Sequence, residues 1–352
     1  MTAKNVITTA MLLIFLSAVS IGTATAKINV VTTFSDFASI TTEIGGDKVN
    51  VEFLSQGDQD PHFVAPKPSL ALKMKKADMF VLTGMDLEIW ASTLIDKARN
   101  KKIMDGGIGY VTVYTGLEIL EKPKGAISRT GGDVHVSGNP HIHTSPTNWK
   151  RISENILIGL IKVDPKNEGF YRTRQSVFVD KVDRSMYGND LVDLIGGDKL
   201  SEMLCAGTLY TFLDKEYQGK KLISRLGGWH KKALPFRDKK IMAYHKNWTY
   251  FCRDFGLNII GFIEPKPGIP PTPKHVQTCV DLIKDNDIDL MLVANYFEKR
   301  KPSTIAQKTG IHALFLPLSV HAVPAITNNF ELVDSWIDSI NTALKSKAII
   351  SQ

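Results

Sequence analysis

The chain has 352 residues, of which 43 are Lys or Arg and 36 are Asp or Glu, so its formal net charge is +7. The basic residues are spread among acidic ones and form no arms or runs, so this charge does not indicate nucleic-acid binding. A chain of this length can form two domains, each with its own hydrophobic core.

The N-terminus has the pattern of a secretory signal. Lys4 is its only charged residue, an apolar run covers residues 10–21, and residues 24–26 are small, as at a cleavage site. We expect residues 1–26 to be a signal peptide and the mature chain to begin at Lys27. The apolar run is too short for a comfortable membrane span, and no cysteine follows it to carry a lipid. The mature protein is therefore expected to be soluble and periplasmic.

The first half of the mature chain alternates short apolar runs with segments of helical periodicity. We predict strands over residues 27–34, 49–54 and 79–82, with helices over residues 36–44 and 68–76. This alternation is typical of a parallel sheet covered by helices. Residues 27–145 are expected to form an N-terminal α/β lobe that contributes to metal binding.

A long helical segment is predicted at residues 146–190. Ser145 precedes a proline, as at many helix starts, residues 152–161 are helically periodic, and Asp164 with the following proline opens a second amphipathic stretch. We expect a long, rigid helix that joins two lobes. One more surface helix is the alternative, because only length distinguishes the two interpretations.

The second half repeats the pattern of the first. Strands are predicted over residues 240–244, 259–263, 290–295 and 313–318, and helices over residues 248–255, 274–284, 303–309 and 328–344. Residues 191–352 are therefore expected to form a C-terminal α/β lobe. The predicted fold is α/β, with two lobes that are each a parallel sheet flanked by helices.

Three histidines lie far apart in the sequence, each where a buried strand is predicted to end. His62 follows Asp-Pro, His141 follows Asn-Pro, and His245 closes the apolar run of residues 241–244. Ligands bind beyond the carboxyl ends of the strands in open parallel sheets. A zinc finger would instead use ligand pairs a few residues apart. We expect one metal ion in the cleft between the lobes.

An ordered set of motifs extends over essentially the whole mature chain. The set consists of Asp60-Pro61-His62, Asn139-Pro140-His141 ahead of residues 152–156, Asp164-Pro165 with Tyr171, His245 followed by Tyr250-Phe251 and Phe255-Gly256, and the proline-rich residues 265–271. Together they resemble the metal-binding solute-binding proteins of bacterial zinc and manganese ABC importers. The resemblance implies two lobes, a rigid connecting helix, and a metal ion held between the lobes. It further implies delivery of the ion to an ABC permease at the inner membrane, no enzymatic activity, and a monomer.

The resemblance makes His62, His141 and His245 metal ligands. An aromatic residue commonly follows the family's second histidine, whereas His143 lies two residues after it here, so His143 is an alternative to His141. His135 lies beside the glycine-rich residues 131–133. It is either a weak collector of metal, resembling the histidine-rich loops of some zinc importers, or part of a solvated linker.

The fourth ligand is where the chain departs from the family's pattern. The family usually offers an aspartate in the loop after the last strand, but residues 316–321 contain no acid. Either His321 or a water is expected to complete the site, with an exposed His321 on the cleft rim as the alternative. Glu264 and Glu298 lie near strand ends and are not chosen as ligands. Asp60 either holds the ring of the next histidine or caps the following turn.

His245 indicates which metal is bound. In manganese-binding members the corresponding position carries a carboxylate, and a third imidazole shifts the site towards borderline-soft ions such as zinc. Zinc is therefore the expected ion and manganese is less favoured. Copper and nickel should also bind in vitro by the general affinity order.

Three cysteines, Cys205, Cys252 and Cys279, occur in the chain. An oxidising compartment permits one disulfide with one thiol left over. The alternative is that all three are small buried hydrophobic residues. The sequence does not choose between these arrangements.

Other functions remain as alternatives. A secreted zinc hydrolase would also use three histidines and a water, but the chain has neither His-Glu-x-x-His nor Gly-x-Ser-x-Gly. A surface adhesin with a structural metal is a role that some family members also have. Siderophore and haem receptors share the two-lobe plan, but three matched histidines favour a bare ion.

Overall fold

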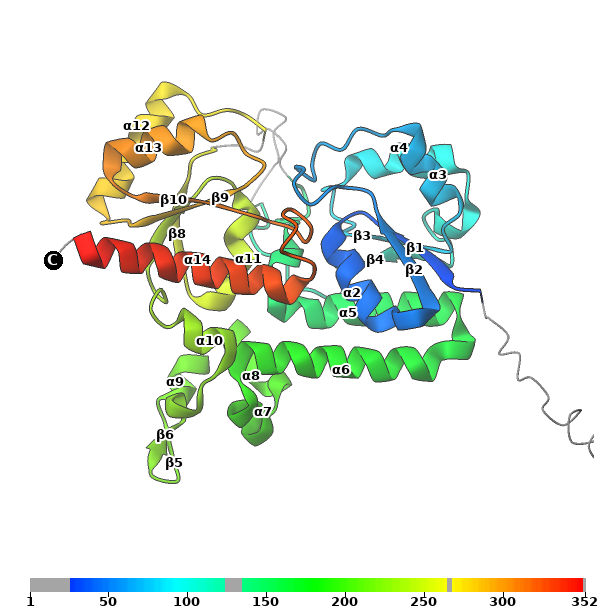
Figure 1. The fold of residues 1–352 in the computed structure, drawn as a ribbon, viewed down its shortest axis with the longest axis horizontal. Coiled ribbons are helices and arrows are strands. Elements are labelled where there is room, and N and C mark those ends of the chain that lie inside the picture. The colour runs from blue at the N-terminus through cyan, green and yellow to red at the C-terminus, as the bar shows by residue number, and fades with distance from the viewer. Residues whose placement is uncertain (1–25, 124–134, 265–267, 351–352) are drawn as a thin grey trace, which may run out of the picture.

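The computed structural model describes residues 26–123, 135–264 and 268–350. Residues 1–25 of the expected signal peptide and the glycine-rich residues 131–133 lie outside these ranges. Two lobes lie side by side over a pair of long helices (Figure 1). In the described ranges, no helix is long and apolar enough to cross a membrane.

The first lobe is built on a four-stranded parallel sheet in the order β2-β1-β3-β4. Its strands are β1 (Ile28–Thr32), β2 (Val49–Phe53), β3 (Met79–Leu82) and β4 (Tyr110–Thr112). Helices α2 (Ser35–Gly45) and α5 (Pro146–Val163) cover one face, and α3 (Pro68–Lys75) and α4 (Ile89–Ala98) cover the other. The central β3 is apolar and buried along its whole length, as expected of a parallel strand covered on both faces.

The second lobe repeats this plan with the strand order β10-β9-β7-β8, again all parallel. Its strands are β7 (Lys240–Ala243), β8 (Asn258–Phe262), β9 (Leu290–Ala294) and β10 (His312–Leu316). Helices α11 (Thr249–Phe255) and α14 (Asn329–Ile350) pack on one face, and α12 (Pro273–Asp285) and α13 (Arg300–Thr309) on the other. The predicted two-lobe α/β fold is confirmed.

Helices α5 and α6 (Glu168–Tyr187) form the link between the lobes. Helix α6 packs on α2 of the first lobe and on α10 (Gly228–Ala233) of the second, and α5 contacts β3, β4 and α11. One hydrophobic cluster runs through both lobes and the two linking helices. The long connecting helix expected from the sequence is therefore present, and its core is continuous with that of both lobes.

The start of α5 is tied to the second lobe just beyond His141. Ser145 caps the helix by accepting the backbone N–H of Asn148, at 3.1 Å. The Ser145 hydroxyl in turn donates to the buried Asp254 carboxylate at 2.6 Å. The Arg253 guanidinium donates a hydrogen bond to the other oxygen of this carboxylate at 2.9 Å. This network holds the segment that carries His141 in a fixed place.

A group of short elements follows α6 and was not predicted from the sequence. It contains α7 (Asn189–Ile195), α8 (Gly197–Cys205), α9 (Leu209–Leu213), and a hairpin of β5 (Glu216–Tyr217) and β6 (Lys220–Lys221). Glycines with positive φ, Gly188 at 81° and Gly196 at 90°, separate the first helices. Helices this short do not show a clear hydrophobic period. The short α4 and β4 were likewise not predicted.

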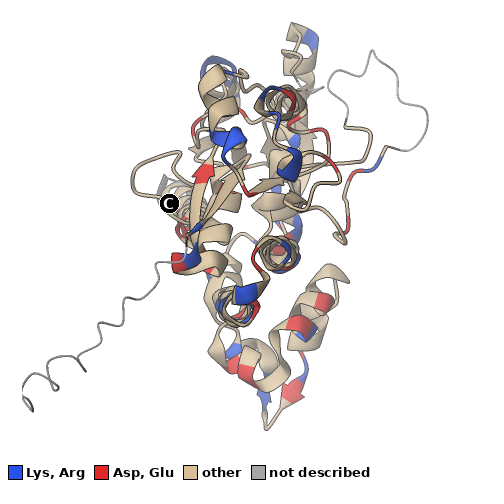
Figure 2. Ribbon diagram, turned by 90° about the vertical axis from the view of Figure 1, so that its right-hand side faces the viewer, with Lys and Arg blue, Asp and Glu red and all other residues tan. Residues whose placement is uncertain are grey.

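Lysines and arginines are interspersed with acidic residues along the ribbon in Figure 2. The three cysteines are all free. Cys252 and Cys279 are buried, as the interpretation without a disulfide expects, whereas Cys205 is exposed.

The loop after β10 reaches from the second lobe to the first. The Ser35 hydroxyl donates to the Val320 carbonyl at 2.6 Å. A Cβ on Gly57 would lie only 2.2 Å from the same carbonyl oxygen, so this close approach requires glycine. The start of α2 and the loop after β2 therefore both contact the loop after β10 of the second lobe.

Asp36 is buried beside this loop, with 1% of its surface exposed. Burial raises the pKa of the Asp36 carboxyl from 3.8 to about 7, and the hydrogen-bonding groups of Ser319 and Val320 offset only part of that rise. A protonated carboxyl near neutral pH is therefore part of the contact between the lobes.

Asp36→Asn tests this assignment. Between pH 3.8 and about 7 the folded protein binds the Asp36 proton and the unfolded chain does not, so the free energy of unfolding falls as pH rises. Asparagine stays neutral. As the pH rises from about 5 to about 8, the free energy of unfolding should therefore fall less in the variant than in wild type. Urea titrations of both proteins, with the exposed Asp238→Asn as control, measure the difference. Parallel pH profiles of wild type and Asp36→Asn would contradict the assignment.

Candidate metal centre

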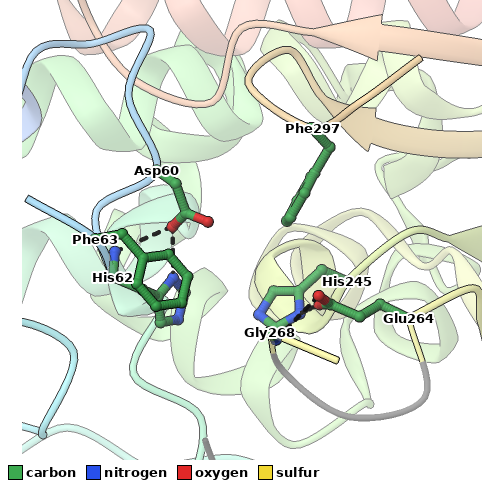
Figure 3. Close-up of a pocket in the computed structure, with 7 residues that line it drawn as sticks. All are labelled: Asp60, His62, Phe63, His245, Glu264, Gly268 and Phe297. Atoms are coloured by element: carbon green, nitrogen blue, oxygen red, sulfur yellow. Dashed lines mark hydrogen bonds and ion pairs between the residues drawn. The ribbon is translucent and has the colours of Figure 1, made fainter. Parts of the chain in front are cut away.

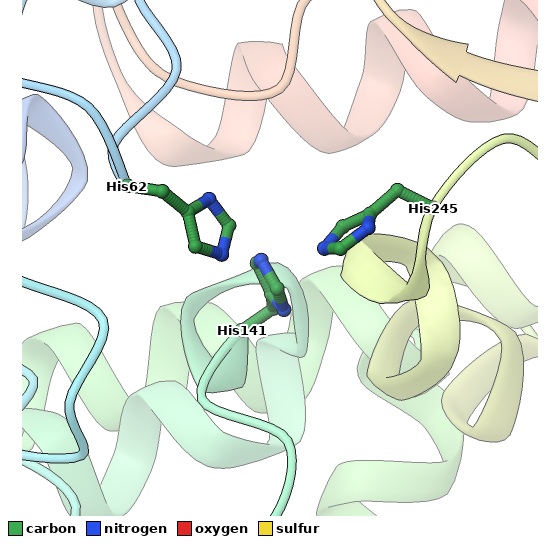
Figure 4. Close-up of side chains that lie close together, drawn as sticks. All are labelled: His62, His141 and His245. Carbon is green, nitrogen blue, oxygen red and sulfur yellow. The ribbon is translucent and has the colours of Figure 1, made fainter. Parts of the chain in front are cut away.

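Three histidines from separate elements point toward one another between the lobes (Figure 4). His62 lies in the loop after β2, His141 directly precedes the short helix η4 (Ile142–Thr144), and His245 follows β7. One ring nitrogen of each lies within 4.8 Å of the others. Their ring centroids are 5.2 to 5.5 Å apart. The structure therefore brings together the three residues that the sequence singled out.

Each of these rings is oriented by an oxygen at its Nδ1 atom. The partners of His62, His141 and His245 are Asp60 at 2.7 Å, Asn139 at 2.9 Å and Glu264 at 2.5 Å, respectively. Because each oxygen is an acceptor, each Nδ1 carries the proton and each Nε2 presents its lone pair. Three lone pairs therefore converge on one point.

The Asp-Pro-His and Asn-Pro-His motifs position their histidines in the same way. The Asp60 side chain accepts the backbone N–H of His62 at 3.0 Å with the oxygen that holds the ring. The Asn139 side chain does the same for the backbone N–H of His141, at 3.0 Å. This is the local turn that Asp and Asn form with the residue two positions on. Both roles considered for Asp60, holding the ring and capping the turn, are thus present.

Burial keeps the imidazole of His141 neutral. Burial, followed by the nearby rings of His62 and His245, holds the pKa of His141 well below its usual range. Among the described residues, the buried Nε2 atoms of His141 and His245 have no hydrogen-bond partner. Neutral, unpartnered imidazole nitrogens that face one another are what a transition metal binds. The donor set therefore fits a metal ion.

His135 lies at the edge of this group. Its Nε2 is 3.3 Å from the Nε2 of His62, and its ring centroid is 6.2 Å from that of His141. Burial and the neighbouring His62 lower the pKa of His135 to about 3. His135, which the sequence left as either a weak metal collector or part of a solvated linker, is therefore a neutral imidazole next to the three converging rings.

His143 does not join the group. It is buried behind His141, with the ring centroids 6.3 Å apart, and lies 5.4 Å from the ring of Phe34. Burial lowers the pKa of His143 to about 3. The structure thus places His141, and not His143, among the converging rings.

His321 also lies outside the group that the described residues form. It has a left-handed φ of 62°, is exposed, and stacks on Phe53 of the first lobe with ring centroids 5.6 Å apart. This places it on the loop after β10 and not among the converging rings. Glu298 is exposed too, and its carboxylate accepts the backbone N–H of Arg300 at the start of α13 at 2.8 Å.

A small pocket leads to the histidines (Figure 3). Its lining consists of Asp60, His62, Phe63, His245, Glu264, Gly268 and Phe297. Its cavity volume of about 10 Å³ is far below the roughly 300–1,000 Å³ of pockets for organic ligands. An ion suits this space better than a siderophore or haem.

A family model described as "Zinc-uptake complex component A periplasmic" matches residues 30–185 and 221–346. The chain belongs to this family. Residues 186–220, which hold the short elements after α6, lie outside the match.

Curated relatives extend over most of the chain. A manganese ABC transporter substrate-binding lipoprotein, PsaA of Streptococcus mitis, is 24% identical over 289 residues, covering 81% of this chain and 78% of the relative. A metal ABC transporter substrate-binding lipoprotein of Lactococcus lactis is 25% identical over 289 residues, covering 81% and 77%. The PsaA name thus specifies manganese and the Lactococcus lactis name no particular metal, whereas the family description specifies zinc.

Solved structures share the fold. The crystal structure of ZnuA superposes with a TM-score of 0.66 at 22% identity, covering 90% of this chain and 99% of that one. A periplasmic metal binding protein from Candidatus Liberibacter asiaticus gives a TM-score of 0.62 at 19% identity, covering 90% and 100%. The two-lobe arrangement is therefore that of known periplasmic metal-binding proteins.

Substitution of His135 and of His321 tests which of the two residues contributes to metal binding. His135→Ala should weaken zinc binding by at least about tenfold, since changing even a residue that only supports a ligand costs about that much. His321→Ala is the matched histidine control and should bind zinc as wild type does. Competition with a chromophoric chelator measures both affinities. Weakening by His321→Ala without an effect of His135→Ala would contradict this placement.

Proposed function

We propose that this protein captures zinc between its two lobes outside the cytoplasm and delivers it to an ABC permease. The observation that carries the proposal is the convergence of three Nε2 atoms, from His62, His141 and His245, with their Nδ1 atoms engaged elsewhere. Membership of a family of metal-importer components supports the delivery step. We propose that the protein has no enzymatic activity.

Zinc is proposed because the converging donors are nitrogens. Manganese favours carboxylate, carbonyl and water oxygens, whereas imidazole suits zinc. The carboxylates of Asp60 and Glu264 are hydrogen-bonded to ring Nδ1 atoms, and neither belongs to the converging group. Although PsaA of Streptococcus mitis is named for manganese, the donor set here therefore favours zinc.

We further propose that His135 completes a four-nitrogen site. Zinc sites are almost always tetrahedral when four protein ligands are available. The Nε2 of His135 lies 3.3 Å from that of His62. His135 is outside the group whose nitrogens all lie within 4.8 Å of one another, so its ring has to move toward His141 and His245 to bind the same ion. This assignment replaces His321, which stacks on Phe53.

Two further parts of the proposal follow from the importer role. Capture outside the cytoplasm requires export, so the N-terminal signal peptide and a periplasmic location remain predictions. The ion would pass to a permease in the inner membrane, and a monomer is expected.

Metal content tests the proposed cargo. Wild-type protein equilibrated with equal concentrations of zinc and manganese should retain one zinc per chain by mass spectrometry, because nitrogen ligands favour zinc. His62→Ala, His141→Ala and His245→Ala should each lose it, while His312→Ala, a histidine on β10, should keep it. Manganese retained in preference to zinc, or zinc kept by all three variants, would contradict the proposal.

Removal of the metal separates a transport receptor from an adhesin with a structural metal. Both lobes have their own buried hydrophobic clusters, so the metal-free chain should stay folded. Circular dichroism before and after chelation should show the same helix and strand content. Cooperative unfolding on chelation would favour a structural metal.

A further inference from the structure

Glu264 uses both of its carboxylate oxygens at the candidate metal centre. One oxygen accepts the Nδ1–H of His245 at 2.5 Å, and the other accepts the backbone N–H of Gly268 at 3.0 Å (Figure 3). The side chains of Glu264 and His245 are 8% and 3% exposed. Glu264 is therefore a buried acid that ties a candidate ligand to a turn at the pocket.

The Gly268 turn reaches the opposite lobe. A Cβ built on Gly268 would lie 3.5 Å from the Cζ atom of Phe63, so the two residues are neighbours. Phe63 directly follows His62, and both line the pocket with Gly268. A chain of contacts thus runs from His245 through Glu264 and Gly268 to Phe63 and His62.

We propose that Glu264 is a positioning residue that slows release of the metal, by fixing His245 and the Gly268 turn with one carboxylate. This inference rests on the proposed function, since it concerns the same ion. Phe63 and Gly268 line this pocket together with His62 and His245, so an ion that leaves through the pocket passes these two residues. Glu264 restrains both the ring of His245 and the turn.

Glutamate suits both contacts at this position. The two contacts use different oxygens of Glu264, and glutamine has only one acceptor oxygen, so a glutamine side chain in the same place loses one of them. Aspartate is one methylene shorter and cannot reach both groups. The negative charge also matters, because neutral imidazoles leave the charge of a divalent ion uncompensated. A carboxylate on Nδ1 offsets that charge and increases the basicity of the ligand.

The decisive variant is Glu264→Gln, and Glu298→Gln is its matched control. Glu298 is also a glutamate that accepts backbone N–H groups, from Arg300 and Lys301, and no histidine of the described residues is among its hydrogen-bond partners. Zinc-loaded proteins are mixed with excess chelator, and the rate of zinc transfer is followed by stopped flow. Glu264→Gln should raise the Kd by about 10–100-fold, mainly through faster release. Glu298→Gln should behave like wild type.

A spectroscopic readout separates positioning from a loss of fold. The visible d–d bands of the Co²⁺-loaded protein report the ligand geometry, and they should change in Glu264→Gln and not in Glu298→Gln. The metal-free variants should have the same circular dichroism as wild type. If Glu264→Gln does not fold, Glu264→Asp provides the test, because it keeps the charge but reaches only one partner. Its zinc should also leave faster than from wild type.

The outcomes distinguish this inference from the proposed function. Zinc release at the wild-type rate from Glu264→Gln, or from Glu264→Asp if only that variant folds, overturns the role of Glu264 and leaves the zinc site intact. A wild-type protein that holds no zinc overturns the proposed function itself. Faster release together with an altered Co²⁺ spectrum supports the role of Glu264.

Discussion

The candidate metal centre depends on three imidazole rings that are held with their ring nitrogens facing one another. A buried polar atom without a partner costs roughly 1–3 kcal/mol, and the Nε2 atoms of His141 and His245 have none among the described residues. The rings keep this orientation because each Nδ1 is hydrogen-bonded to an oxygen of Asp60, Asn139 or Glu264. The three rings are therefore oriented to hold a cation.

Both lobes are needed for this arrangement. His62 is supplied by the first lobe, His245 by the second, and His141 by the segment that leads into the linking helices. The shared hydrophobic cluster and the Ser145–Asp254 contact hold that segment against the second lobe. The loop after β10 bridges the lobes through Ser35. The distance between the candidate ligands is therefore set by how the lobes pack.

Much of the fold could be predicted from the sequence, because buried parallel strands such as β3 and β9 are continuous apolar runs. The two Asx-Pro-His motifs are local turns and equally visible. Either His321 or a water was expected as the fourth ligand, and the left-handed backbone of His321 and its stacking on Phe53 depend on contacts between distant segments. The approach of His135 to His62 and the two-oxygen role of Glu264 also depend on tertiary packing. No local sequence pattern encodes them.

Anomalous diffraction at the zinc edge, from crystals of the mature chain grown with zinc, is the most direct test of the central claim. The account predicts one peak between the lobes, about 2.0–2.1 Å from the Nε2 atoms of His62, His141 and His245. A strong peak elsewhere, or none at the three histidines in zinc-saturated crystals, would contradict it.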